Sequence, residues 1–147
     1  MIERRKSRQA ALELLYQREI VGGRIADAVA GYVRIPTNKP LPDFCRRLLG
    51  GIEVNQRTID DIIDVNADNW ALERLPLIDR NILRIAIYEM LYESDIPVSV
   101  SINEAIELAK KYGSPESGKF INGVLGHVAV SLEQPHEVSP GSKKEAK

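Results

Sequence analysis

Cysteine, aromatic residues and long apolar runs are all scarce in this 147-residue sequence. With only one cysteine, Cys45, no intramolecular disulfide can form. The simplest expectation is a protein of the reducing cytoplasm. The apolar residues near Cys45 in the sequence predict a buried thiol rather than a nucleophile. No run approaches the roughly 20 apolar residues of a membrane span, and Gln9, Glu13 and Gln17 interrupt the apolar residues near the start, so no secretory signal is predicted. We therefore expect a soluble, cytoplasmic protein that contacts no membrane.

The common catalytic and cofactor motifs are missing as well. The sequence contains no Gly-rich phosphate loop, no His-Glu-x-x-His, no nucleophile elbow and no Cys-x-x-Cys pair. The two histidines, His127 and His136, stand apart, and His127 is expected on a helix surface. The acids Asp60, Asp61 and Asp64 are more typical of a solvated helix face than of a metal site. We expect neither an enzyme nor a bound metal or cofactor.

Charge is distributed unevenly, although the formal net charge is only −1. Residues 4–8 hold four bases and no acid, whereas residues 53–107 hold twelve acids against four bases. A helix start exposes N–H groups and a partial positive charge, so four cations there oppose helix formation and indicate an anionic partner. A solvated helix end or a disordered basic tail has the same composition, so composition leaves both interpretations open. The acidic middle suits a basic protein or a solubilising exterior.

Helical periodicity dominates the chain and alternating strand patterns are nearly absent, which predicts an all-α fold. The segment 79–92 is apolar around most of its circumference and is predicted to be the central helix. Two glycines at 22–23 are expected to end the first helix. Two more, at 50–51, lie inside a long helix predicted to begin at Asp43, and they indicate a close helix contact or a bend there.

The second half of the chain carries two helix-start signals. Ser101 and Glu104 have the spacing of a capping box. Ser114 precedes Pro115, which is typical of an N-cap followed by proline at the first helical position. We predict a helix after each signal.

These segments predict one helical domain over residues 1–132. It is expected to divide into subdomains of about 1–68 and 69–132, with Trp70 filling the core. Residues 133–147 have the composition of a flexible polar tail.

The last two predicted helices also have the spacing of a DNA-binding helix-turn-helix motif. The residues that would face base edges are 116–119, which supply one cation and one anion. Because a duplex presents a dense lattice of phosphates, that charge is unfavourable for DNA. We favour two packed helices of a larger bundle.

A specific pattern of motifs runs through the chain. The second half contains DRNILRIAIYE at 79–89, INEAIELAKKYG at 102–113 and KFINGVL at 119–125, and an arginine-rich helix occupies the start at 4–17. In this order and spacing the motifs resemble the NusB family of bacterial transcription antitermination factors. The resemblance covers residues 4 to about 132.

The resemblance implies about seven helices in two small bundles, forming an RNA-binding adaptor rather than an enzyme. Proteins of this family bind the boxA element of nascent ribosomal RNA leader transcripts together with NusE, a small-subunit ribosomal protein. With RNA polymerase and other Nus factors, the pair helps elongation through terminators. Monomer and homodimer are both compatible with the resemblance, and the residues that dock NusE are not identified by it. The alternative is a NusB-like protein-interaction module associated with ribosomal RNA modification.

Carried over by motif position, the RNA contacts implied are basic, aromatic and acidic side chains from three segments. They are Arg4, Arg5, Lys6, Arg8, Tyr16, Asp79, Glu116 and Phe120. Arginine and lysine neutralise phosphate, the two aromatic rings can stack on unpaired bases, and a carboxylate can accept hydrogen bonds from base amino groups, which suits single-stranded RNA. Core packing of the rings and helix capping by Asp79 are the competing interpretations. The hypothesis is that these residues converge on one groove.

Overall fold

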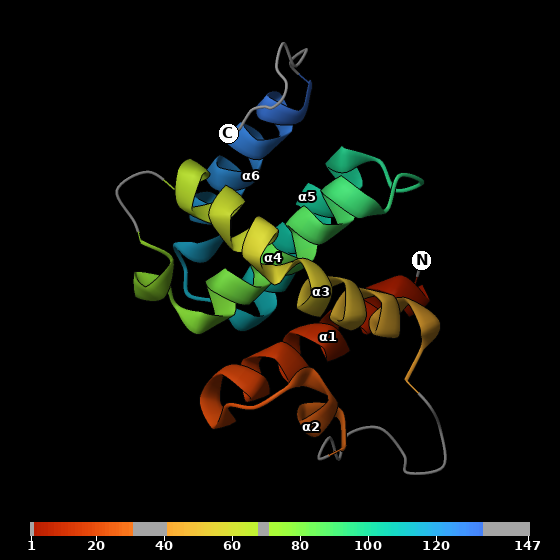
Figure 1. Cartoon of the computed structure of the whole chain (residues 1–147). Coiled ribbons are helices and arrows are strands. Elements are labelled where there is room, and N and C mark those ends of the chain that lie inside the picture. The colour runs from red at the N-terminus through yellow and green to blue at the C-terminus, as the bar shows by residue number, and fades with distance from the viewer. Residues whose placement is uncertain (1, 31–40, 68–70, 134–147) are drawn as a thin grey trace.

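The computed structural model describes residues 2–30, 41–67 and 71–133, and their backbone forms six α-helices and one short 3₁₀ helix (Figure 1). No strand occurs among the described residues, which confirms the all-α prediction. None of the described helices is long and apolar enough to cross a membrane. The elements are α1 (Ile2–Val21), α2 (Ile25–Ala30), α3 (Asp43–Asn66), η1 (Leu72–Arg74), α4 (Leu77–Tyr92), α5 (Val98–Tyr112) and α6 (Ser117–Glu133).

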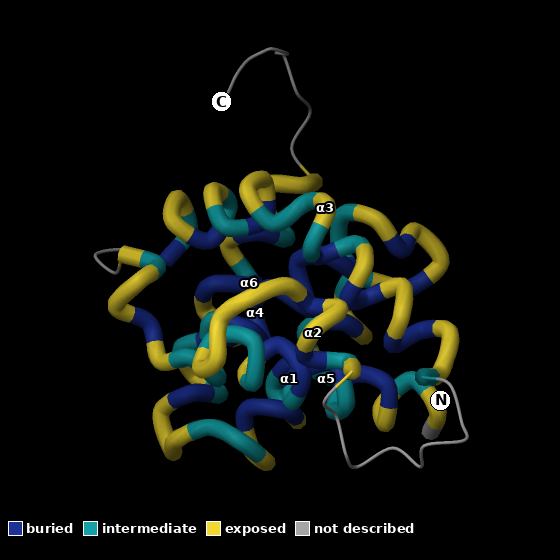
Figure 2. The backbone as a smooth tube through the Cα atoms, turned by 60° about the horizontal axis from the view of Figure 1, so that its bottom comes forward, coloured by how far each residue is buried: buried dark blue, intermediate teal, exposed yellow. Residues whose placement is uncertain are grey.

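α4 is the central helix, as its all-round apolar pattern predicts. It packs against α1, α3, α5 and α6 and lies in the middle of the molecule in Figure 1. Nearly every residue from 79 to 89 is buried. Figure 2 shows buried backbone gathered inside and exposed turns along the outside. These four helices are therefore held in place by the face that each presents to α4, whereas α2 packs against α1 and α3.

Two glycine pairs act as the sequence indicates. α1 ends at Val21, and Gly22 and Gly23 follow with φ of +86° and +89°, a conformation that favours glycine. Inside α3, a Cβ on Gly51 would lie 2.1 Å from Cε1 of Tyr88 on α4. The predicted close helix contact is confirmed, since α3 and α4 approach too closely there for any side chain at this position.

The predicted capping box is wrong. α5 begins at Val98, so Ser101 lies inside the helix rather than before it. Its Oγ donates to Oε1 of Glu89 at 2.8 Å, and Glu104 accepts hydrogen bonds from Arg5. Both side chains have tertiary partners in place of the local capping bonds.

The predicted cap of the last helix also differs in detail. α6 begins at Ser117, two residues later than proline at the first helical position would place it. The Oγ of Ser117 accepts a hydrogen bond from the N–H of Ser114 at 3.0 Å, the reverse of the expected direction. The turn between α5 and α6 is therefore closed by the later serine.

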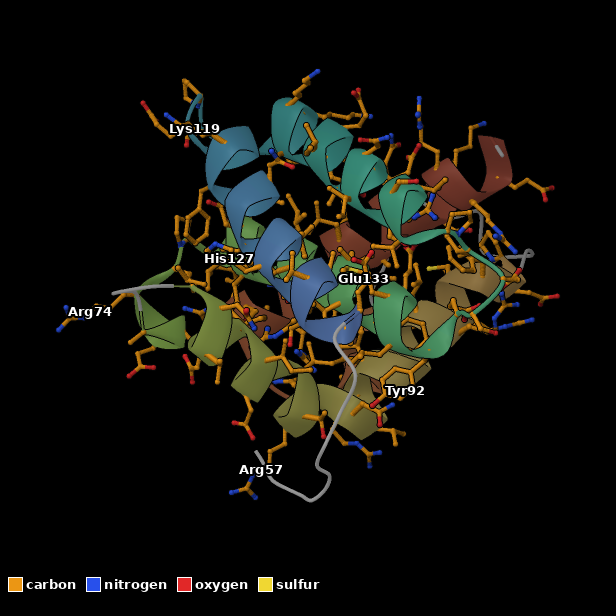
Figure 3. The ribbon with its side chains drawn as sticks, turned by 90° about the horizontal axis from the view of Figure 1, so that it is seen from above. Arg57, Arg74, Tyr92, Lys119, His127 and Glu133 are labelled. Carbon is orange, nitrogen blue, oxygen red and sulfur yellow. The ribbon has the colours of Figure 1, made fainter. Side chains whose placement is uncertain are left out.

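Three other predictions can be placed. Cys45 is fully buried, and burial raises the pKa of its thiol to about 11, so it is a packed side chain as expected. His127 is exposed on α6, between Lys119 near the beginning and Glu133 at the end of that helix (Figure 3). Trp70 and residues 134–147 of the predicted tail lie outside the described residues, whereas Glu133 is the last residue of α6. The division into two subdomains stays a prediction.

Candidate nucleic-acid interface

Side-chain hydrogen bonds tie α1 to α5 in the same order along both helices. The pairs are Arg5 with Glu104, Gln9 with Lys111, and Glu13 with Tyr112. Because residues 5, 9 and 13 are each four apart, they form one row on the surface of α1. The row leads from the basic start of the chain toward the end of α5.

Arg4 and Arg5, at the beginning of α1, are paired with carboxylates of α5 and of the segment that joins α4 to α5. Arg5 donates Nε and Nη2 to the two carboxylate oxygens of Glu104 at 3.0 and 2.7 Å, and its side chain stays 54% exposed. The hydrogen bonds between the two side chains lower the pKa of Glu104 and raise the pKa of Arg5. Arg4 donates to Asp95 at 3.2 Å, and Lys6 is exposed. These cations face solvent and can exchange partners.

Arg8 has a different environment from its neighbours. It is only 4% exposed and donates two hydrogen bonds, of 2.6 and 2.9 Å, to the buried carboxylate of Glu89 on α4. The same carboxylate accepts from Ser101 on α5. Arg8 therefore joins three helices, and its role in RNA contact stays a prediction.

The sequence interpretation missed an aromatic centre among these arginines. The buried ring of Phe44, in the first turn of α3, has the guanidinium carbons of Arg4, Arg8 and Arg47 at 5.0, 5.3 and 5.2 Å from its centroid. Arg47 is half exposed and bonded to Glu93. Arg46 and Arg47 in the first turns of a helix were the available signal, since they repeat the charge conflict seen in α1.

Asp79, Glu116 and Phe120 come together at a second place. With Ser117 they line a pocket of about 180 Å³ where α4 and α6 begin. Asp79 is 5% exposed and accepts a 2.7 Å hydrogen bond from Oγ of Ser117. Burial raises the pKa of Asp79, and the hydrogen bond from Ser117 partly opposes the shift. The structure thus joins Asp79 with two residues that lie 37 and 41 positions later in the sequence.

Tyr16 lies on α1, beyond the basic residues, and lines neither hollow. It is 39% exposed. Glu13, before it on α1, bonds to Tyr112 at the end of α5, and Glu19, after it, bonds to Asn81 and Arg84 in the first half of α4. The basic residues line one groove, Asp79 and Phe120 line another, and the two share no lining residue. The basic residues and the pair Asp79 and Phe120 thus belong to two separate hollows, and one continuous RNA surface along α1 that includes both stays a prediction.

Comparison with known proteins identifies close relatives over most of the chain. A family model described as the NusB family matches residues 5–130. The transcription antitermination protein NusB of Anaeromyxobacter sp. (strain Fw109-5) is 43% identical over 133 residues, covering 89% of this chain and 92% of that protein. The protein of the same name from Myxococcus xanthus (strain DK1622) is 44% identical over 137 residues, covering 90% and 98%.

Solved structures show the same similarity in three dimensions. T. maritima NusB matches with a TM-score of 0.76 and 40% identity, covering 86% of this chain and 90% of that chain. A structure of the antitermination factors NusB and NusE in complex with dsRNA matches with a TM-score of 0.79 and 25% identity, covering 89% and 98%. The sequence and the helical arrangement are therefore both similar to those of NusB proteins.

Proposed function

The chain belongs to the NusB family, and we propose that it is a transcription antitermination factor that binds boxA RNA of nascent ribosomal RNA leaders together with NusE. The observation that carries the proposal is the similarity to transcription antitermination proteins along about nine-tenths of the chain. The protein acts in the cytoplasm as an adaptor and not as an enzyme. Its partners are RNA, NusE and the RNA polymerase elongation complex with the other Nus factors.

The surface that α1 spans supports RNA as the ligand. Exposed cations at its beginning can neutralise phosphates, and the exposed ring of Tyr16 and the partly buried ring of Phe120 can stack on bases. Asp79 and Glu116 lie beside Phe120, where carboxylates can accept hydrogen bonds from base amino groups. We propose that these side chains contact RNA directly, along with Arg4, Arg5, Lys6 and Arg8 from the beginning of α1.

A second protein strengthens this binding in our proposal. The cations at the start of α1 are few and most are already paired with carboxylates, so RNA binding by this chain alone is expected to be weak and sensitive to salt. The related complex contains NusE as well as RNA. A partner that contacts both the chain and the RNA raises the effective concentration of the RNA contacts.

The test is a binding titration on short RNAs with and without purified NusE. We expect single-stranded boxA RNA to bind more tightly than a shuffled RNA of the same composition, and the difference to grow when NusE is added. Duplex RNA belongs in the same series, because the related complex contains dsRNA. Sedimentation of the samples distinguishes a monomer from a homodimer. Equal binding of boxA and shuffled RNA in the presence of NusE would count against the proposal, and recovery of a ribosomal RNA methyltransferase without RNA would favour the interaction-module alternative.

A further inference from the structure

A groove lies between the beginning of α1 and the segment that joins α4 to α5. Arg4 and Arg5 stand on one side of it, and Pro97 and Val100 stand on the other. Its volume is about 460 Å³, within the range of roughly 300–1,000 Å³ that small-molecule sites occupy. The groove is therefore large enough for a nucleotide, and its two sides differ in chemistry.

The basic side of the groove presents arginines in the geometry that binds phosphate. Arg5 holds Glu104 through two hydrogen bonds, of 3.0 and 2.7 Å, from Nε and Nη2. A planar guanidinium binds carboxylate and phosphate with the same fork of two N–H groups. The Arg5 side chain is 54% exposed, whereas Glu104 is 17% exposed and also lies 3.7 Å from Nη1 of Arg8. Glu104 therefore keeps a cation beside it when a phosphate takes its place on Arg5.

Arg4 also pairs with a carboxylate at the groove, through one hydrogen bond. It donates to Asp95 at 3.2 Å across the mouth of the groove, and the Asp95 side chain is 65% exposed. The guanidinium of Arg4 is also supported from behind by the ring of Phe44, whose centroid lies 5.0 Å away. Both arginines are thus held at the groove by contacts that do not use all of their donors.

The opposite side of the groove is apolar and partly open to solvent. Val100 is 38% exposed, Pro97 is exposed, and Ile96 is buried beneath them. An apolar surface beside a pair of guanidinium groups matches the two parts of a nucleotide, since the base and sugar offer apolar faces and the phosphate offers charge. A peptide carboxylate or a free anion would use the arginines and leave this surface uncovered.

We propose that this groove is a subsite for one nucleotide of single-stranded RNA, with its phosphate on Arg4 and Arg5 and its base or sugar on Pro97 and Val100. The phosphate displaces the carboxylates of Asp95 and Glu104, which hold the arginines in position when RNA is absent. The inference rests on the proposed RNA-binding function and adds the side of the groove that α5 contributes.

The first test places a negative charge in the groove or just outside it. Val100→Glu puts a carboxylate where the nucleotide is expected, and Ser99→Glu makes the same charge change one residue away at an exposed position that does not line the groove. An acidic residue suits the first turn of a helix, so both variants should fold. We expect Val100→Glu to weaken binding of boxA RNA by about tenfold or more, and Ser99→Glu by no more than about threefold.

The second test removes a competing carboxylate. Glu104→Gln keeps the size of the side chain and frees Arg5, whereas Glu107→Gln makes the same change at a side chain that pairs with Lys110. We expect Glu104→Gln to bind boxA RNA at least about threefold more tightly than Glu107→Gln does. Thermal melts of all four variants establish that each is folded.

The outcomes separate this inference from the proposed function. If the unmodified protein with NusE does not distinguish boxA from shuffled RNA, the proposed function fails. If it does, and Val100→Glu and Ser99→Glu weaken binding equally, the groove is not a nucleotide subsite. If Glu104→Gln binds no better than Glu107→Gln, the exchange of a carboxylate for a phosphate is overturned.

Discussion

Arg5 and Arg8 are three residues apart on one helix, yet they differ in burial and therefore in structural role. The Arg5 side chain is 54% exposed, and solvent screens its pair with Glu104. Arg8 and Glu89 are almost completely buried, with side chains 5% and 1% exposed. A buried charge requires a partner, because an isolated one loses its hydration without compensation. Arg8 therefore belongs to the core as much as to the basic surface.

We predict that Arg8→Ala lowers the free energy of unfolding by about 3–5 kcal/mol, because it leaves the Glu89 carboxylate buried without its cation. Arg5→Ala should leave the unfolding midpoint near that of the unmodified protein and weaken RNA binding. Urea titrations followed by circular dichroism measure the stability of both variants, and a titration with boxA RNA measures the binding of Arg5→Ala. Adding Glu89→Gln to Arg8→Ala removes the stranded charge and should recover part of the loss. Equal stability of Arg8→Ala and Arg5→Ala would contradict this assignment.

The adjacent glycines of α3 offer a second comparison at single residues. A Cβ on Gly50 would meet nothing within 4 Å, whereas a Cβ on Gly51 would lie 2.1 Å from the ring of Tyr88. We predict that Gly50→Ala stabilises the protein by up to about 1 kcal/mol, since alanine favours the helix. Gly51→Ala should destabilise it by about 1–3 kcal/mol through overpacking. The same urea titrations measure the free energies of unfolding of both variants. Similar effects of the two substitutions would show that α3 and α4 can move apart.

Between elements, polar clusters join the helices that the apolar core brings together. Arg84 on α4 donates to Asp60 on α3 at 2.8 and 3.1 Å and to Glu19 on α1 at 2.5 Å. Arg84 is 3% exposed, so its charge must be balanced by these carboxylates. Burial acts to raise the pKa of Glu19, but hydrogen bonding and charge interaction with Arg84 outweigh it, and the pKa of Glu19 is lowered.

This lowered pKa predicts a dependence of stability on pH. A carboxyl group whose pKa falls on folding stabilises the protein above its ordinary pKa of 4.5, and the contribution disappears as the pH drops toward the lower pKa of the folded state. Glu19→Gln should therefore reduce the melting temperature at pH 7, and the reduction should shrink below about pH 4.5. Thermal melts from pH 3 to pH 7 measure it. Glu73→Gln makes the same change on the exposed surface of η1 and serves as control, and a deficit that does not depend on pH would contradict the prediction.

At the scale of the whole molecule, the proposed RNA surface joins two sites of opposite character. One is the arginine groove at the beginning of α1, and the other is the pocket of Asp79 and Phe120. Phosphate contacts depend on salt because binding releases counterions, whereas stacking on aromatic rings depends on it little. The two sites should therefore be separable by salt titration.

We predict that the double variant Arg4→Ala with Arg5→Ala reduces the slope of log affinity against log salt by about 0.7, because the proposed subsite holds one phosphate and each phosphate contact on a single strand contributes about 0.7. The matched control is Arg57→Ala with Arg74→Ala, which removes two exposed arginines from α3 and η1 (Figure 3). Affinities of boxA RNA at several salt concentrations give the slopes. An equal change in both double variants would show that only total charge matters.

Helix positions could largely be predicted from the sequence, and their side-chain partners could not. The glycines that end α1, the helix that begins at Asp43 and the central position of α4 all follow from local patterns. The capping box at Ser101 also follows from a local pattern, yet it is absent because Glu89 and Arg5 bind its two members. A short signature states which bond can form, and a tertiary contact with a better partner decides which one does.

By itself the sequence determines the all-α fold, the central helix and the likeness to the NusB family, because helical periodicity and motif order are properties of neighbouring residues. Which of four adjacent cations is buried was decided only by the tertiary structure. Arg8 meets a carboxylate 81 positions away and Arg5 meets one 99 positions away, and no local pattern reports such distances. The difference between Arg8, which holds helices together, and the more exposed cations beside it arises from packing, because burial alone changes what a charge requires.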